Sequence, residues 1–219
     1  AKQKTTSMKT QNPPAATISP QKEGWTTFII RLFVGVLFIF SGLIKLNDPV
    51  GTKIKLEEYF EVFAADLPWA TGLFHALVPM ALVLAVVLCA AEVVLGVALL
   101  LRYRLKATLW VLLGLIVFFT FLTFYSAWFN RVTDCGCFGD AIKLTPWQSF
   151  GKDVLLLALI LVLISRRNRL SSNQSRRAGL AVGVSAIMCV AVGIYAIIFL
   201  PPFDLLPYKK GDNIAENMK

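Results

Sequence analysis

The residues best suited to chemistry are two cysteines separated by one glycine, Cys135 and Cys137, in the segment DCGCFGD at residues 134–140. Such a pair can close a very small disulfide ring, for which Gly136 supplies the backbone freedom. We expect a ring of this size to be strained, and strained or exposed disulfides exchange more readily than relaxed, buried ones. The spacing therefore favours thiol–disulfide exchange.

Two other interpretations of the cysteine pair stay open. The pair can be a structural staple that holds a tight turn, or it can belong to a zinc site. Zinc takes about four ligands in tetrahedral geometry, and the same side of the membrane adds only His75 and carboxylates to the two cysteines. We rank zinc last and predict no metal site. His75 itself is expected to lie at the membrane interface.

Glu92 lies well inside an apolar run, where an ionisable side chain is a candidate for function. At about 1.5 Å per residue, Arg31 lies about 9 Å from the inner end of its span and Glu92 about 13 Å from the same end of the next span, so the two can pair. An ion pair that locks two helices is the favoured interpretation. The alternative is that Glu92 accepts a proton when a bound quinone is reduced or oxidised.

Lys45 and Asp153 are a further candidate pair. Lys45 belongs to the sequence SGLIKLNDP at residues 41–49, near the outer end of the first apolar run, and its long side chain can simply reach the interface. It can also meet Asp153, about a turn and a half into the fourth run, at the depth of the cysteine segment. A cation at that depth would stabilise an attacking thiolate.

Apolar helices must position these side chains. Of the 219 residues, 57% are hydrophobic and only 16% are charged, and the mean hydropathy is +0.67. These values exclude an ordinary soluble globular protein. Five runs reach the length of about 20 residues that a membrane span needs. We predict an all-α polytopic membrane protein with spans at Trp25–Leu46, Ala76–Leu101, Leu105–Phe129, Trp147–Ile164 and Ala178–Leu200.

The net charge of +9 predicts the topology. One side of the predicted membrane carries twelve Lys and Arg against one acidic residue, and the other carries eight against eleven. Because basic loops stay in the cytoplasm, we predict a disordered cytoplasmic tail at 1–24, a basic cytoplasmic loop at 166–177 and a periplasmic tail at 201–219. The basic residues lie between apolar runs rather than in a patch on a soluble domain, which argues against a nucleic-acid partner.

Two periplasmic elements follow from local patterns. In the segment 52–68, apolar residues recur at helical spacing, which predicts an amphipathic helix on the outer membrane surface. It serves as an anchor or as a lid over a site. Thr145, Pro146 and Gln148 form a capping-box pattern, so the fourth span is expected to begin just after the cysteines.

The remaining cysteines and a glycine pair carry weaker signals. Cys89 and Cys189 fall near the middle of their spans, where a free cysteine is usually a small apolar filler; an internal electron relay is the less favoured interpretation. Gly179 and Gly183 form a G-x-x-x-G pattern, which is compatible with close helix packing within this chain or to another one.

Over residues 25–165 the chain resembles the DoxX-like superfamily of small bacterial inner-membrane proteins, especially its MauE-type branch. The resemblance rests on SGLIKLNDP at residues 41–49, on Glu92 followed by Gly96, and on DCGCFGD leading to Lys152 and Asp153. It implies a four-helix membrane domain, to which the span at 178–200 is an addition. Extended members of this kind occur in Bacteroidota, where a further periplasmic portion can follow.

The resemblance also implies a function. MauE-type proteins are associated with periplasmic disulfide formation or thiol redox, often beside a thioredoxin-like partner, and other DoxX-like proteins are linked to quinone-coupled oxidation. Carried over, the redox residues are Cys135 and Cys137. We therefore expect an inner-membrane thiol-disulfide oxidoreductase, with quinone as the one candidate cofactor. The main alternative is a non-catalytic subunit of a larger membrane complex.

Overall fold

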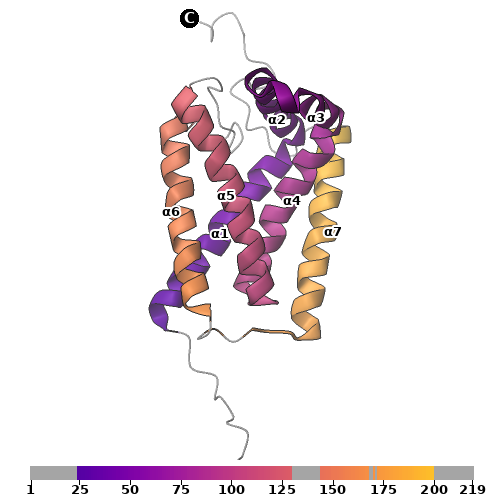
Figure 1. The fold of residues 1–219 in the computed structure, drawn as a ribbon. Helices are drawn as coiled ribbons and strands as arrows, with labels where there is room; N and C mark the ends of the chain where they lie inside the picture. The colour runs from indigo at the N-terminus through magenta and orange to yellow at the C-terminus, as the bar shows by residue number, and fades with distance from the viewer. Residues whose placement is uncertain (1–23, 130–143, 168–169, 171, 200–219) are drawn as a thin grey trace, which may run out of the picture.

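A computed structural model describes residues 24–129, 144–167, 170 and 172–199. The helices of this part stand side by side in a bundle, with two shorter helices across one end (Figure 1). In chain order they are α1 (Trp25–Asn47), α2 (Pro49–Asp66), α3 (Thr71–Leu77), α4 (Ala81–Leu100), α5 (Leu105–Phe129), α6 (Pro146–Ser165) and α7 (Arg176–Phe199), with short 3-10 turns at Pro68–Ala70 and Val78–Met80.

The structure confirms five helical segments that are long and apolar enough to cross a membrane. Their limits agree closely with the predicted spans, except that the second begins earlier, at Pro68, and is interrupted before α4 by the 3-10 turn at Val78–Met80. Pro79 lies in that turn, and proline cannot continue the hydrogen bonding of a preceding helix. The predicted capping box is also present: Gln148 N donates to Thr145 Oγ1, and Thr145 N donates to Gln148 Oε1.

The end of the bundle that carries α2 and α3 is called the outer end below, since the sequence predicts that it faces the periplasm. A helix is present over most of the predicted segment 52–68, as α2, capped by Asp48, whose carboxylate accepts from Gly51 N at 2.9 Å. Leu56, Tyr59 and Phe63 of α2 are buried, with Phe63 packed against α5. The helix therefore covers part of the bundle.

The helices α1 and α4 approach each other closely because glycines line their contact. A Cβ atom built on Gly42 would lie 2.7 Å from Val93 Cγ2 and 2.9 Å from Glu92 Cβ. A Cβ on Gly96 would lie 2.8 Å from the carbonyl oxygen of Gly35. These distances leave no room for a side chain, so the glycines set how near Glu92 comes to α1.

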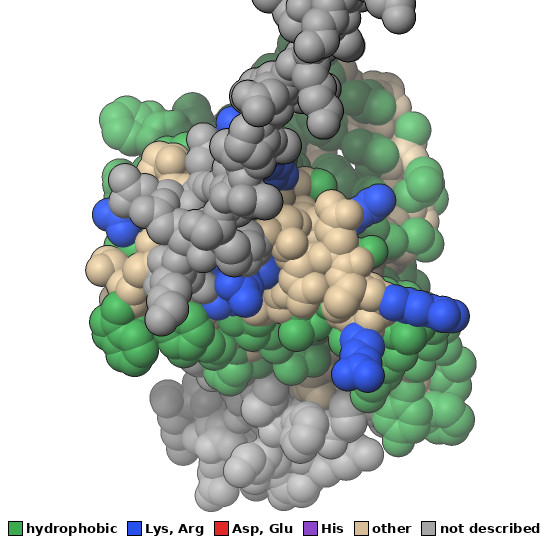
Figure 2. Space-filling model, turned by 90° about the horizontal axis from the view of Figure 1, so that it is seen from below, with side chains coloured by type: hydrophobic (Ala, Val, Ile, Leu, Met, Phe, Trp, Pro, Cys, Tyr) green, Lys and Arg blue, Asp and Glu red, His purple; other side chains and the backbone are tan. Residues whose placement is uncertain are grey.

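At the opposite end of the bundle, called the inner end, the connection between α4 and α5 binds the connection between α6 and α7. Asn173 N donates to the carbonyl of Arg102 at 2.9 Å, and the ring of Tyr103 packs against Gly179 of α7. Seen from this end, Lys and Arg side chains spread over the surface, and none of the described acidic side chains is in view (Figure 2). Gly183 has open space around it, so within the described residues the glycine pair brings only Gly179 into a close contact.

The glycine contact generates a paired prediction. Gly42→Ala should lower the free energy of unfolding by about 1–3 kcal/mol, because the added methyl group overpacks the α1–α4 contact. Gly114→Ala is the matched control, since Gly114 lies in α5 with nothing within 4 Å of a built Cβ, and alanine should be neutral or slightly stabilising there. Denaturant titration in mixed micelles measures both. Equal effects would show that the α1–α4 contact is not tight.

Candidate functional site

An ion pair joins α1 to α4 inside the bundle. Lys45 Nζ binds Glu92 Oε1, and the two side chains are 8% and 2% exposed. Lys45 Nζ also lies 4.5 Å from the centre of the Phe119 ring of α5, a cation–π distance. Burial of an unpaired charge costs several kcal/mol, so each member of this pair depends on the other.

A second ion pair comes from α6 and faces the first. Lys152 Nζ lies 2.6 Å from Asp153 Oδ1, and Thr123 Oγ1 of α5 donates to Asp153 Oδ2 at 3.0 Å. The Asp153 side chain is 1% exposed, whereas Lys152 is 20% exposed. Asp153 is thus fixed by two neighbours. Lys152 is the most accessible charged group of the two ion pairs.

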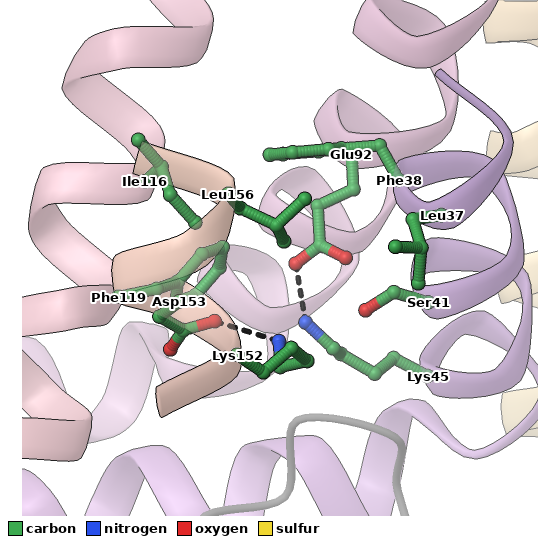
Figure 3. Close-up of a pocket in the computed structure, with 10 residues that line it drawn as sticks. All are labelled: Leu37, Phe38, Ser41, Lys45, Glu92, Ile116, Phe119, Lys152, Asp153 and Leu156. Carbon is green, nitrogen blue, oxygen red and sulfur yellow. Dashed lines mark hydrogen bonds and ion pairs between the residues drawn. The ribbon is translucent and has the colours of Figure 1, made fainter. Parts of the chain in front are cut away.

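The two ion pairs line one small pocket between α1, α4, α5 and α6. Ser41 and five apolar side chains complete its wall (Figure 3). In Figure 3 the Lys45 and Lys152 ammonium groups point toward the centre, with Glu92 and Asp153 beside them. The pocket measures about 20 Å³, which is room for about one water molecule. A quinone ring does not fit in it.

One predicted pairing is wrong. Glu92 pairs with Lys45, whereas Arg31 donates to the carbonyl oxygens of Leu99 and Leu100 at 3.2 and 2.6 Å. The depth comparison assumed that α1 and α4 end level at the inner side. Gly35 faces Gly96, yet α1 continues inward from that contact by ten residues and α4 by four. The stagger is about 9 Å, and it brings Arg31 to the last carbonyls of α4, where a cation is favourable.

Lys45 and Asp153 do reach a common site, as their depths predict. They line the same pocket, and their ion partners there are Glu92 and Lys152. Cys135 and Cys137 lie outside the described residues. In the described part, no group of three or more His, Cys, Asp or Glu side chains could hold a metal ion, and His75 is exposed on α3.

Cys89 and Cys189 pack as small apolar side chains, as expected. Both are buried in one cluster with Leu46 and Val93, so α7 joins α1 and α4 in a shared core. Gly193 of α7 extends this contact: a Cβ atom there would lie 3.2 Å from Val86 and 3.3 Å from Leu46.

Three residues that line the pocket or bond to its charged groups were missed in the candidate set. Lys152 carried a usable signal, because it is a second charge inside an apolar run, next to Asp153. Thr123 carried none, being one of several threonines on α5 that bond to their own helix. Phe119 is one phenylalanine in an aromatic run, and only the packing of α5 against α1 brings it to Lys45.

The arrangement is suited to holding and moving a proton. Two ammonium groups and two carboxylates give no net charge, so the cluster is tolerable in an apolar bundle. Within the described residues, Oε2 of Glu92 has no hydrogen-bond partner although it is buried. Among the described residues, that oxygen is therefore an acceptor position left open in the cluster.

The buried pair generates a stability prediction. Lys45→Met should lower the free energy of unfolding by about 3–5 kcal/mol, because it leaves Glu92 charged and buried without its cation. The double variant Lys45→Met/Glu92→Leu should recover most of that loss. The control is Lys53→Met, which breaks the partly exposed Lys53–Glu57 pair at 3.3 Å and should cost under about 1 kcal/mol. Denaturant titration in mixed micelles measures all three, and an equal loss in Lys45→Met and Lys53→Met would refute the buried pair.

Comparisons with known proteins agree with this architecture. The family model described as methylamine utilisation protein MauE matches residues 23–166, which span α1 to α6 and leave α7 outside. Protein TlpB of Flavobacterium psychrophilum is 23% identical over 199 residues, covering 88% of this chain and 47% of its own length. The chain thus spans about half the length of that curated relative. No solved structure matches. By the extent of the family match, the chain belongs to the MauE family of multi-pass membrane proteins.

Proposed function

We propose that the protein is a thiol–disulfide oxidoreductase of the bacterial inner membrane. Cys135 and Cys137 exchange electrons with a thioredoxin-like dithiol in the periplasm, and a quinone in the bilayer is the second redox partner. The observation that carries the proposal is the cluster of Lys45, Glu92, Lys152 and Asp153 inside the bundle, because charged groups inside a membrane bundle are costly to retain without a role.

Chain connectivity supports the link between the cysteines and this cluster. Phe129 and Thr145, which flank the cysteine segment, end α5 and cap α6 at the outer end of the bundle (Figure 1). Lys152 and Asp153 follow six and seven residues after Pro146, about 9–11 Å along α6. Both helices that lead to the cysteines also line the pocket.

The proposed reaction balances in two halves. Two thiols lose two electrons and two protons, and a bond forms between their sulfur atoms. The quinone gains two electrons and two protons and becomes a quinol. In the reverse direction the same atoms move back, and the quinol reduces the disulfide. Glu92 receives or supplies a proton at Oε2 during this exchange, and Lys45 balances the charge of its deprotonated form.

A cysteine-labelling experiment tests the proposal. The chain has four cysteines, so Cys89→Ala/Cys189→Ala leaves only the proposed redox pair. In membranes of cells that express this variant, a membrane-impermeant maleimide should label the pair only after reduction by a strong dithiol. Oxidation should return when an oxidised quinone replaces the dithiol.

Two further variants complete the test. Cys137→Ser in the same background should trap a mixed disulfide with a thioredoxin-like protein, whereas Cys135→Ser/Cys137→Ser should trap none. Thiols that stay labelled under all conditions, or a disulfide inert to strong dithiols, would exclude the proposal.

A non-catalytic subunit of a larger complex is the second candidate, and the surface of α7 favours it. Leu180, Val184 and Ile187 are exposed there, and Gly183 has open space around it. In that case Cys135→Ser/Cys137→Ser should leave the cellular function intact, and the protein should purify with partners in fixed proportion. Loss of function in the cysteine variant would exclude this candidate.

A further inference from the structure

A large aromatic cavity lies beside the charged pocket, between α2, α3 and α5. It measures about 740 Å³ and is lined by eight aromatic residues, four leucines and Asp66. Sites for small molecules typically measure about 300–1,000 Å³ and are mainly apolar with a few polar groups. The cavity thus has the size and the lining of a ligand site, and neither the family match nor the relative assigns one to it.

Phe63 of α2 is the centre of the aromatic lining. Its ring lies 5.6 Å from Phe74, 5.9 Å from Phe121 and 4.8 Å from Tyr125, measured between ring centres. Rings at these distances attract each other in offset or edge-to-face geometry. The α2 helix is therefore fixed on α5 by ring contacts, and the surfaces between them favour a flat, aromatic ligand.

The cavity opens toward the surface that a bilayer would cover. Phe118, Phe121 and Phe129 line it and are also 41–53% exposed on α5. Since α5 is one of the spanning helices, a ligand dissolved in lipid can enter from the side. This access favours a lipid-soluble compound over a water-soluble one.

One corner of the cavity is polar. The Tyr125 hydroxyl donates to the Asp66 carboxylate, and both residues belong to the lining. A carboxylate and a phenol oxygen are acceptors, and the negative charge disfavours phosphate headgroups. The corner therefore suits a neutral ligand that carries a hydroxyl donor on its ring.

The helix α5 separates this cavity from the charged pocket. Phe118, Phe121 and Leu122 line the cavity, while Ile116 and Phe119 line the charged pocket on the other side of the helix. The Phe119 ring packs against the Tyr59 and Phe63 cluster and also lies under Lys45 Nζ. A ring bound in the cavity would thus be one aromatic side chain away from the ion pair.

We infer that the cavity binds the ring of a lipid-soluble quinol, with a ring hydroxyl donating to Asp66 and Tyr125. The inference rests on the proposed function and names the binding site of its quinone partner. Stacking on the phenylalanines holds the ring, and the opening along α5 leaves the isoprenoid tail in the bilayer.

The test measures binding of decylubiquinol to the full chain in phospholipid nanodiscs. Phe118→Ala should weaken binding about two- to tenfold, because one stacking surface is lost. Phe124→Ala is the matched control: Phe124 is 40% exposed on the same helix and packs on Trp128 and Phe150 outside the cavity lining. It should leave binding unchanged.

The hydroxyl contact is tested separately. Tyr125→Phe keeps the ring and removes the hydroxyl, and it should weaken decylubiquinol binding about two- to tenfold without changing binding of the dimethyl ether of that quinol. Equal effects of Phe118→Ala and Phe124→Ala, or binding unchanged in Phe118→Ala and Tyr125→Phe, would show partition into lipid and overturn the site.

The outcome of the binding experiment is independent of the outcome of the labelling experiment. If Cys135 and Cys137 cycle with quinone but decylubiquinol binding does not depend on Phe118, this site is wrong and the proposed function stands. If binding depends on Phe118 and Tyr125 but the cysteines never cycle, the proposed function is wrong and the cavity is a quinol site of another role.

Discussion

Burial of Lys45, Glu92 and Asp153 in an apolar bundle, beside the half-buried Lys152, is the constraint on which the rest of the structure depends. Lys45 and Glu92 must meet because neither can be left charged and unpaired in this setting. Their meeting requires α1 and α4 to approach within the space that Gly42 and Gly96 provide. Each of the two motifs on α1 and α4 that carry the family resemblance thus contains a charged residue and a nearby glycine. The glycine lets the partner helix come near.

The helix α5 ties the charged cluster to the outer end of the bundle. One side of it supplies Phe119 and Thr123 to the ion pairs, and another supplies Phe121 and Tyr125 to the rings of α2. Because the cysteine segment at residues 134–140 follows α5 in the sequence, the same helix leads to all three features. A shift of α5 would change the charged pocket and the aromatic cavity together.

Much of the fold could be predicted because the length of an apolar run and the residues of a helix cap determine the limits of a helix from neighbouring residues alone. The limits of α5 agree with the predicted Leu105–Phe129, and Thr145 caps α6 through the pattern read from three residues. The depth of a residue in the bundle depends also on how its helix is shifted against the neighbouring helices. Counting residues from the span ends predicted correctly that Lys45 and Asp153 share a site. The same count paired Glu92 with Arg31, which is wrong because tertiary packing sets the stagger of α1 against α4.

The aromatic cavity could not be predicted from the sequence, because it too depends on tertiary packing. The phenylalanines of residues 118–129 predict only an apolar span, and the segment 52–68 predicts an anchor or a lid without deciding between the two. Contacts between Phe63 and rings about 60 residues later decide that the two surfaces meet. Local patterns fix the elements, whereas their mutual register creates the site.

The central claim is that the buried cluster handles the protons of the cysteine pair. Its most direct test is the rate at which reduced Cys135 and Cys137 are reoxidised by quinone in membrane vesicles, compared between Glu92→Gln and Lys53→Met. Glu92→Gln should slow reoxidation about tenfold or more, since a proton acceptor is lost, while Lys53→Met should leave the rate unchanged. Equal rates in both variants, with equal amounts of folded protein, would contradict it.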